Sequence, residues 1–267
     1  MFRRGDSVGK HCAKFETGAA RMREFEATTL WRISEFERIR AETGGSGYVG
    51  LERQTVLPST MQAELRQLQQ LHDSVDVVEL LAACLRHREP ALIYFHCQGL
   101  VWPITLFPAE EMLHSPRDIV SAPDASLAAL RTGSVEPPGV RPPGHWMTER
   151  VASRACYLPL RPALWALALR GPSTSLVREL GGVAAYRALR HPSAQGLPAP
   201  GALGPAAAQL HRDAAALRTL ARWSGMSLER GIRLLNGLYL TSNLIVSRTH
   251  PNAKRQPTAR DFDRGLG

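Results

Sequence analysis

Two histidines and a cysteine are the side chains whose types could support nucleophilic chemistry. His96 and Cys97 are adjacent, and His114 follows in the next part of the chain. A histidine can activate a thiol, but neighbours on a β-strand point to opposite faces, so adjacency builds no dyad. Glu110 and Glu111 diverge on a helix in the same way and do not form a carboxylate pair. We therefore expect no enzyme and no cofactor, and we keep a hydrolase or transferase only as a third class of function.

The four cysteines also have too wide a spacing for a zinc knuckle. This spacing favours reduced thiols, no metal site and a cytoplasmic protein. No apolar run approaches the length that spans a bilayer, so we expect no membrane association.

The elements that would position these residues are a hairpin and the helices before it. Apolar residues at helical spacing predict an amphipathic helix over 19–42, followed by a glycine-rich linker. A second helix should begin after Pro58 with Ser59 or Thr60 as its N-cap, and a third should cover 75–87. Strands over 91–97 and 100–107 read as a hairpin, in which Pro103 predicts an edge strand or a bulge.

The second half of the chain is expected to be helical. Short helices are predicted at 161–170, 176–180 and 184–190, and longer ones at 206–224 and 227–241. The predicted fold class is mainly α (α+β), with a small N-terminal α+β module that contains the hairpin. The expected organisation is a helical extension (1–43), a flexible linker (44–57), an acidic α+β module (58–120), a Pro-rich connection (121–146), a helical region (147–200) and a C-terminal domain with a basic tail (201–267).

Charge is unevenly distributed along the chain, whose formal net charge is +9. Residues 51–130 carry 5 Lys and Arg against 10 Asp and Glu, whereas residues 201–267 carry 10 against 4. A basic region of this kind is typical of a surface that faces a polyanion. The competing explanation is the arginine bias of a GC-rich bacterial genome, because only three of the basic residues are lysines.

Residues 220–235 resemble the helix-turn-helix core of winged-helix regulators. Ala221 is small where two helices would cross, Gly225 can adopt the left-handed turn, Met226 faces the core and Ser227 can cap the next helix. Inward-facing leucines follow at Leu234, Leu235 and Leu238. The step from Asn243 to Arg248 is similar to the family's entry into a wing, with 248–260 as wing and tail.

This resemblance covers about residues 206–250 and implies a winged-helix-like C-terminal domain that binds DNA. Residues 227–240 would be the recognition helix. The residues that would contact bases or phosphates are Ser227, Arg230, Arg233 and Asn236, with Arg218, Arg222, Arg248, Lys254 and Arg255 on the DNA backbone.

Two functions remain open at this point. The first is a cytoplasmic bacterial regulator that contacts DNA through its C-terminal domain. The second is a non-enzymatic adaptor that binds a protein partner through the same helices, with Leu228 as an apolar anchor. The N-terminal amphipathic helix could also pair two copies of the chain into a homo-oligomer.

Overall fold

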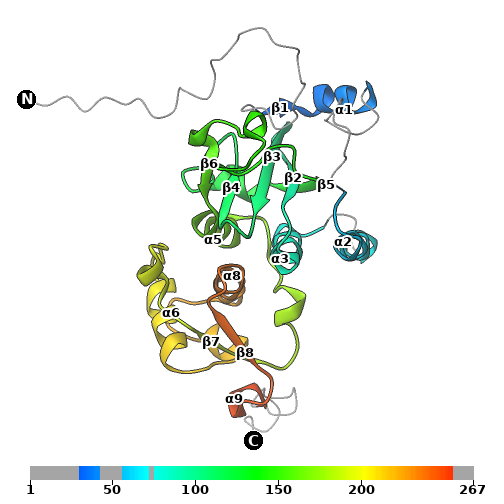
Figure 1. The fold of residues 1–267 in the computed structure, drawn as a ribbon. Helices are drawn as coiled ribbons and strands as arrows, with labels where there is room; N and C mark the ends of the chain where they lie inside the picture. Colours follow the sequence, from blue (N-terminus) through cyan, green and yellow to red (C-terminus); the bar gives the residue numbers. More distant parts are fainter. Residues whose placement is uncertain (1–29, 43–55, 72–74, 255–267) are drawn as a thin grey trace, which may run out of the picture. The chain divides into compact units, whose positions relative to one another are not determined.

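The computed structural model describes residues 30–42, 56–71 and 75–254. The chain divides into two compact units, residues 1–163 (unit 1) and 164–267 (unit 2). The fold is mixed α+β, with an antiparallel sheet in unit 1 and mostly helices in unit 2 (Figure 1). Helix α5 (Leu160–Arg170) contributes residues to both units. None of the helices in the described part of the chain is long and apolar enough to cross a membrane.

The predicted hairpin is confirmed and forms the centre of the unit 1 sheet. Strand β2 (Ala91–Cys97) pairs antiparallel with β3 (Leu100–Phe107) through a turn in which Gln98 and Gly99 both have positive φ. The strand order is β5-β2-β3-β4-β6, and β1 pairs with β3 off this path. The bounds of the other strands are Trp31–Arg32 (β1), Met112–His114 (β4), Arg131–Glu136 (β5) and Tyr157–Pro159 (β6).

The position of Pro103 differs from the prediction, because β3 is an inner strand and not an edge. Pro103 lies opposite Tyr94 of β2. On the other side of β3, β1 pairs with residues 100–101 and β4 with residues 105–107. Pro103 falls between these two partners, where no ladder needs its missing N–H.

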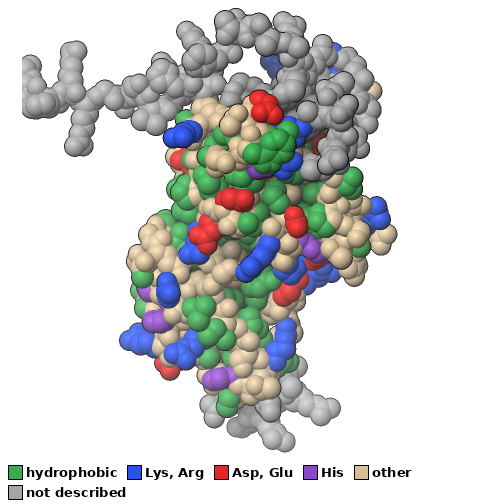
Figure 2. All heavy atoms as spheres, viewed as in Figure 1, with side chains coloured by type: hydrophobic (Ala, Val, Ile, Leu, Met, Phe, Trp, Pro, Cys, Tyr) green, Lys and Arg blue, Asp and Glu red, His purple; other side chains and the backbone are tan. Residues whose placement is uncertain are grey.

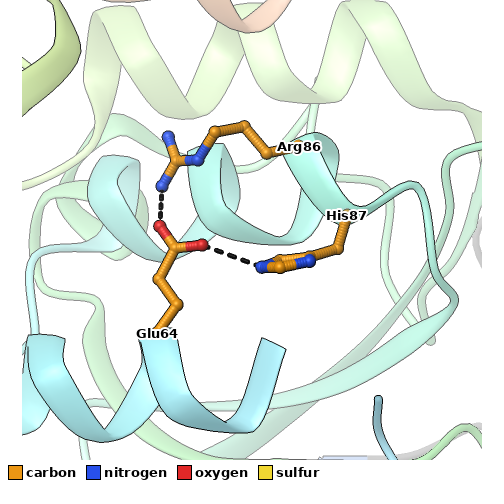
Figure 3. A network of polar contacts seen from close by, with 3 residues as sticks. All are labelled: Glu64, Arg86 and His87. Atoms are coloured by element: carbon orange, nitrogen blue, oxygen red, sulfur yellow. Dashed lines mark hydrogen bonds and ion pairs between the residues drawn. The ribbon is translucent and has the colours of Figure 1, made fainter. Parts of the chain in front are cut away.

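Two helices follow one another in unit 1 before the sheet. Helix α3 (Val77–His87) starts where Asp76 accepts hydrogen bonds from the amides of Val78 and Glu79, and its first two turns are buried. Helix α2 (Ser59–Leu71) is linked to α3 by Glu64 (Figure 3). The Glu64 carboxylate accepts from the Arg86 guanidinium and lies 2.8 Å from His87 Nε2.

The segment predicted as a Pro-rich connection, 121–146, instead contributes structure to unit 1. It contains α4 (Asp124–Ala128) and strand β5, which pairs with β2. The strand was missed because its sequence is polar and lacks apolar alternation. Gly133 permits the pairing, since a Cβ at this position would lie 2.6 Å from the carbonyl oxygen of Tyr94.

The N-terminal helix is shorter in its described part than predicted. Helix α1 covers Ile33–Glu42 and follows strand β1 directly. Residues 31–32, which were also predicted as helix, form this strand, which pairs with β3. Residues 19–29 of the predicted helix, and the glycine-rich stretch 43–50, lie outside the described residues. Phe36 is buried against Leu92, Tyr94 and Val101, so α1 packs on one face of the sheet of its own chain.

The helices of unit 2 have different bounds from those that the sequence predicted, except α5, which was predicted at 161–170. Within the predicted helix 184–190, residues 185–188 form a strand instead, in which Tyr186 and Ala188 are buried and Arg187 between them is exposed. Residues 176–180 contain only a short 3-10 turn. The remaining elements are β7 (Ala185–Ala188), α6 (Leu203–Arg212), α7 (Leu217–Leu220), α8 (Leu228–Leu240), β8 (Leu244–Ser247) and α9 (Pro251–Lys254).

The long helix predicted over 206–224 is interrupted between α6 and α7. Ala215 exchanges two backbone hydrogen bonds with Tyr186 of β7, at 2.8 and 3.0 Å. This bridge requires an extended backbone, so α6 ends at Arg212 and α7 begins at Leu217. On the other edge of β7, strand β8 completes a small antiparallel sheet.

Candidate nucleic-acid interface

Helices α7 and α8 are joined by a turn whose chemistry matches the sequence prediction. Gly225 has φ of 72°, and a Cβ at this position would approach Ala202 Cβ to 2.9 Å. The Ser227 hydroxyl accepts from the Arg230 amide and caps α8. Leu234, Leu235 and Leu238 are buried, as expected.

A glycine lets α7 and α8 approach closely. A Cβ at Gly231 would lie 3.0 Å from Leu217 Cδ1 and 3.5 Å from Leu220 Cδ2. A larger residue would push α7 outward. The crossing therefore depends on Gly231 of α8 and not on Ala221, which is half-buried at the start of the turn.

The exposed surface of this segment is basic. Arg218, Arg222 and Arg230 are exposed, and Glu229 is the acidic residue in the same stretch. One Arg230 nitrogen donates to the Gly225 carbonyl, which steadies the turn. Figure 2 shows Lys and Arg side chains outnumbering Asp and Glu over the part of the unit 2 surface that faces the viewer.

Asn236 does not lie on the exposed face to which the sequence assigned it. Its side chain is completely buried, accepts from the Val177 amide at 3.1 Å and donates to the Ser175 carbonyl at 2.9 Å. Both contacts come from the loop after α5. Asn236 is therefore a structural residue that holds this loop against α8.

Arg233 is also largely committed to internal contacts. Its Nε lies 3.0 Å from a Glu229 oxygen, and one terminal nitrogen donates to the Leu169 carbonyl at the end of α5. One turn further along α8, Gly237 packs against the ring of Trp165. A Cβ added at position 237 would lie only 2.8 Å from the nearest atom of this ring. Helix α8 is thus covered on two sides, and its exposed residues are confined to its first turn. Gly237 is the residue in the sequence that could have indicated the contact of α8 with Trp165, because glycine allows such a close approach.

The structure differs from the expected wing after α8. Strand β8 pairs with β7, which precedes it in the chain, and α9 follows after Ser247. No hairpin follows α8 within residues 244–254. Arg248 donates to the carbonyls of Gly181 and Glu179, at 2.7 and 2.9 Å. The side chain of Lys254 and the whole of Arg255 lie outside what the structure describes.

Leu228, the anchor of the alternative function, is exposed as expected. It retains 54% of its accessible surface in the first turn of α8, between Ser227 and Glu229. Leu228 is thus an exposed apolar side chain two residues before the exposed Arg230.

The residues that suggested nucleophilic chemistry belong to unit 1. His114 is buried in β4 and contacts the ring of Tyr157, with ring centroids 5.2 Å apart. Burial lowers the pKa of His114 to about 4. Among the described residues, no three His, Cys, Asp or Glu side chains gather as a metal site.

Comparisons with protein-family models, with curated proteins and with solved structures find no match to this chain.

Proposed function

We propose that unit 2 binds double-stranded DNA through the α7–α8 turn and the first turn of α8, and that the protein regulates a process on DNA. The resemblance of residues 206–250 to winged-helix domains is part of this proposal. The observation that carries it is the distribution of charge. Residues 164–267 hold 14 Lys and Arg against 5 Asp and Glu, whereas residues 1–163 hold 19 of each.

The depletion of acidic residues argues against genome composition as the sole cause. A bias toward arginine codons would raise the arginine content of both units. Basic residues are in fact similarly frequent in the two, with 19 in 163 positions and 14 in 104. The difference lies in the acidic residues, which fall from 19 to 5, and this leaves the positive charge of unit 2 uncompensated.

The burial of α8 limits the kind of contact that it could make. A recognition helix reads bases with residues near its N-terminus. In α8 the exposed residues are Leu228, Glu229 and Arg230. We therefore expect phosphate contacts from Arg218, Arg222 and Arg230 to supply most of the affinity, with little discrimination between sequences.

The test is fluorescence anisotropy of the full chain with a random-sequence duplex at ~50 and ~200 mM salt. Three phosphate contacts predict that affinity falls roughly 40-fold between these salt concentrations. The double variant Arg222→Glu/Arg230→Glu should abolish binding. Arg187→Glu/Arg190→Glu, which reverses the same charge around β7, is the matched control and should bind more tightly than the first variant. Equal binding by the wild type and the Arg222→Glu/Arg230→Glu variant would exclude this interface.

A second candidate function rests on the exposure of Leu228. An exposed apolar side chain followed by an exposed arginine is also suited to a protein partner with an acidic rim. In that case Leu228→Asp should abolish partner capture. DNA binding in low salt should persist in this variant if phosphate contacts dominate, although the added negative charge would weaken it.

A further inference from the structure

Strand β8 forms one edge of the small sheet of unit 2 (Figure 1). On the far side of β7, Ala215 exchanges two backbone hydrogen bonds with Tyr186, so the N–H and C=O of Tyr186 point away from β8. Val246 lies directly opposite Tyr186 in the β7–β8 ladder. Residues opposite each other in an antiparallel pair either exchange both bonds or both point away. The N–H and C=O of Val246, and of Leu244 two residues before it, are therefore directed outward from the sheet.

The described part of the chain leaves this outer edge of β8 open. No hydrogen bond from outside the β7–β8 ladder reaches the backbone of Leu244 or Val246 there. Helix α9 lies toward the opposite edge of the sheet, where the Asn252 side chain donates to the Ala214 carbonyl at 2.6 Å. The chain that follows β8 thus turns away from the edge and does not cover it.

Strand β8 also lacks the features that usually protect an edge from pairing. Edge strands are commonly blocked by charged side chains, by proline or by a bulge. Strand β8 contains only leucine, isoleucine, valine and serine, and it pairs with β7 without a shift in register. The Ile245 side chain is 45% exposed. Residues of these types favour β-structure, so the edge is suited to accept another uncharged strand.

We propose that β8 pairs antiparallel with β8 of a second copy of the chain, about a twofold axis at Ile245. In this register Leu244 lies opposite Val246 of the second copy, and Val246 lies opposite its Leu244. Each of these pairs exchanges both of its hydrogen bonds, so every outward backbone group of the two edges receives a partner. The two Ile245 side chains face each other in a pair without hydrogen bonds, with Cα atoms about 4.5 Å apart.

The distribution of charge is compatible with a second copy as the occupant. Strand β8 has no charge to attract an acidic or a basic strand, and β8 of a second copy is itself uncharged and complementary in the register above. The arginine of the ladder, Arg187, lies one strand back, opposite Ile245. In the paired sheet the two Arg187 residues are separated by three strand spacings, about 14 Å. This distance exceeds the screening length of about 8 Å at physiological salt, so their repulsion is weak.

The test is sedimentation velocity of the full chain at ~200 mM salt, with protein from ~5 to ~200 μM, because an interface of two short strands predicts a weak dimer. The sedimentation coefficient should rise with concentration. Ile245→Lys should weaken association by about tenfold or more, since it places two like charges at the axis. Leu228→Lys is the matched control. It adds the same charge to an exposed leucine at the other end of α8 and should associate like the wild type.

Disulfide trapping locates the contact in the same protein. The three described cysteines are buried, and Cys12→Ser removes the fourth. In this background Ile245→Cys brings two thiols within the range of a disulfide, so oxidation with glutathione disulfide should yield a covalent dimer. Leu228→Cys should yield far less.

The pairing uses none of the residues of the proposed DNA interface, so these experiments do not depend on DNA binding. A sedimentation coefficient that is independent of concentration, equal association by the wild type and Ile245→Lys, or equal cross-linking through positions 245 and 228 would each overturn the proposal.

Discussion

Unit 1 and unit 2 contain basic residues at similar frequency, but acidic residues are much rarer in unit 2. Unit 1 holds 19 basic and 19 acidic residues, so its formal charges balance. Some of them form ion pairs, such as Arg161 with Glu111 and Arg86 with Glu64. In unit 2, 14 basic residues share 5 acidic ones. Several unit 2 arginines instead donate to backbone carbonyls, as Arg230 does to Gly225 and Arg248 to Gly181. A carbonyl orients the guanidinium without neutralising it, so the positive potential of unit 2 is retained.

The largest expected effect tests whether the two units carry separate roles. Phe95→Ala removes a fully buried ring from the unit 1 sheet and should cost about 4 kcal/mol of unfolding free energy. DNA affinity should be unchanged when measured at a temperature where the variant is folded. Denaturant unfolding and anisotropy check the two parts, and loss of DNA binding in the folded variant would contradict the division of roles.

The next effect is a pH dependence confined to unit 1. Burial lowers the pKa of His114 to about 4, below the ordinary value of 6.5. The unfolded chain therefore takes up this proton first as the pH falls, and stability is lost between pH 6.5 and 4. At pH 4 the loss should be about 3 kcal/mol.

Urea unfolding at pH 7 and pH 4 measures this loss, and His114→Phe is the comparison. Phe keeps a ring beside Tyr157 but cannot be protonated, so other titrating groups affect both proteins equally. The wild type should lose about 3 kcal/mol more than the variant over this range. Parallel pH profiles would show that His114 does not have this role.

Asn236→Ala separates a structural role from a DNA-reading role in unit 2. The substitution leaves the Val177 amide and the Ser175 carbonyl without their partner, and should cost about 2 kcal/mol. DNA affinity should stay within twofold of the wild type. A large loss of DNA affinity with unchanged stability would instead show that Asn236 contacts DNA.

The smallest effect concerns Glu64 in unit 1. Its partial burial acts to raise its pKa, but hydrogen bonds from Arg86 and His87 outweigh this, and the pKa of Glu64 is lowered. Stability from this group is present above its ordinary pKa of 4.5 and lost as the pH falls further. Glu64→Gln should lower the free energy of unfolding by up to about 1 kcal/mol at pH 7. Glu89 is exposed, so Glu89→Gln should lower it by a smaller amount. Equal melting temperatures for both variants at pH 7 would remove this contribution.

Local signals were sufficient to predict the hairpin, α3 and the α7–α8 turn. Each depends on residues that act over short distances, such as Gln98 and Gly99 in the turn, Asp76 as the cap of α3, and Ser227 as the cap of α8. The strands β5 and β7 were not predicted. Their pairing depends on residues far along the chain, namely β2 for β5 and Ala215 with β8 for β7.

The candidate interface was predicted only in part for the same reason. Arg218, Arg222 and Arg230 are exposed because their positions on α7, the turn and the first turn of α8 follow from local periodicity. Asn236 is buried because the loop after α5 covers α8, which no pattern within residues 227–240 reveals.

The most direct test of DNA binding by unit 2 is hydrogen exchange of the full chain, followed by mass spectrometry, with and without a random-sequence duplex at ~50 mM salt. The proposed interface predicts slower exchange in residues 217–230 on adding DNA, and unchanged exchange in strands β2 and β3. Protection of the unit 1 sheet without protection of 217–230, or no protection anywhere, would contradict it.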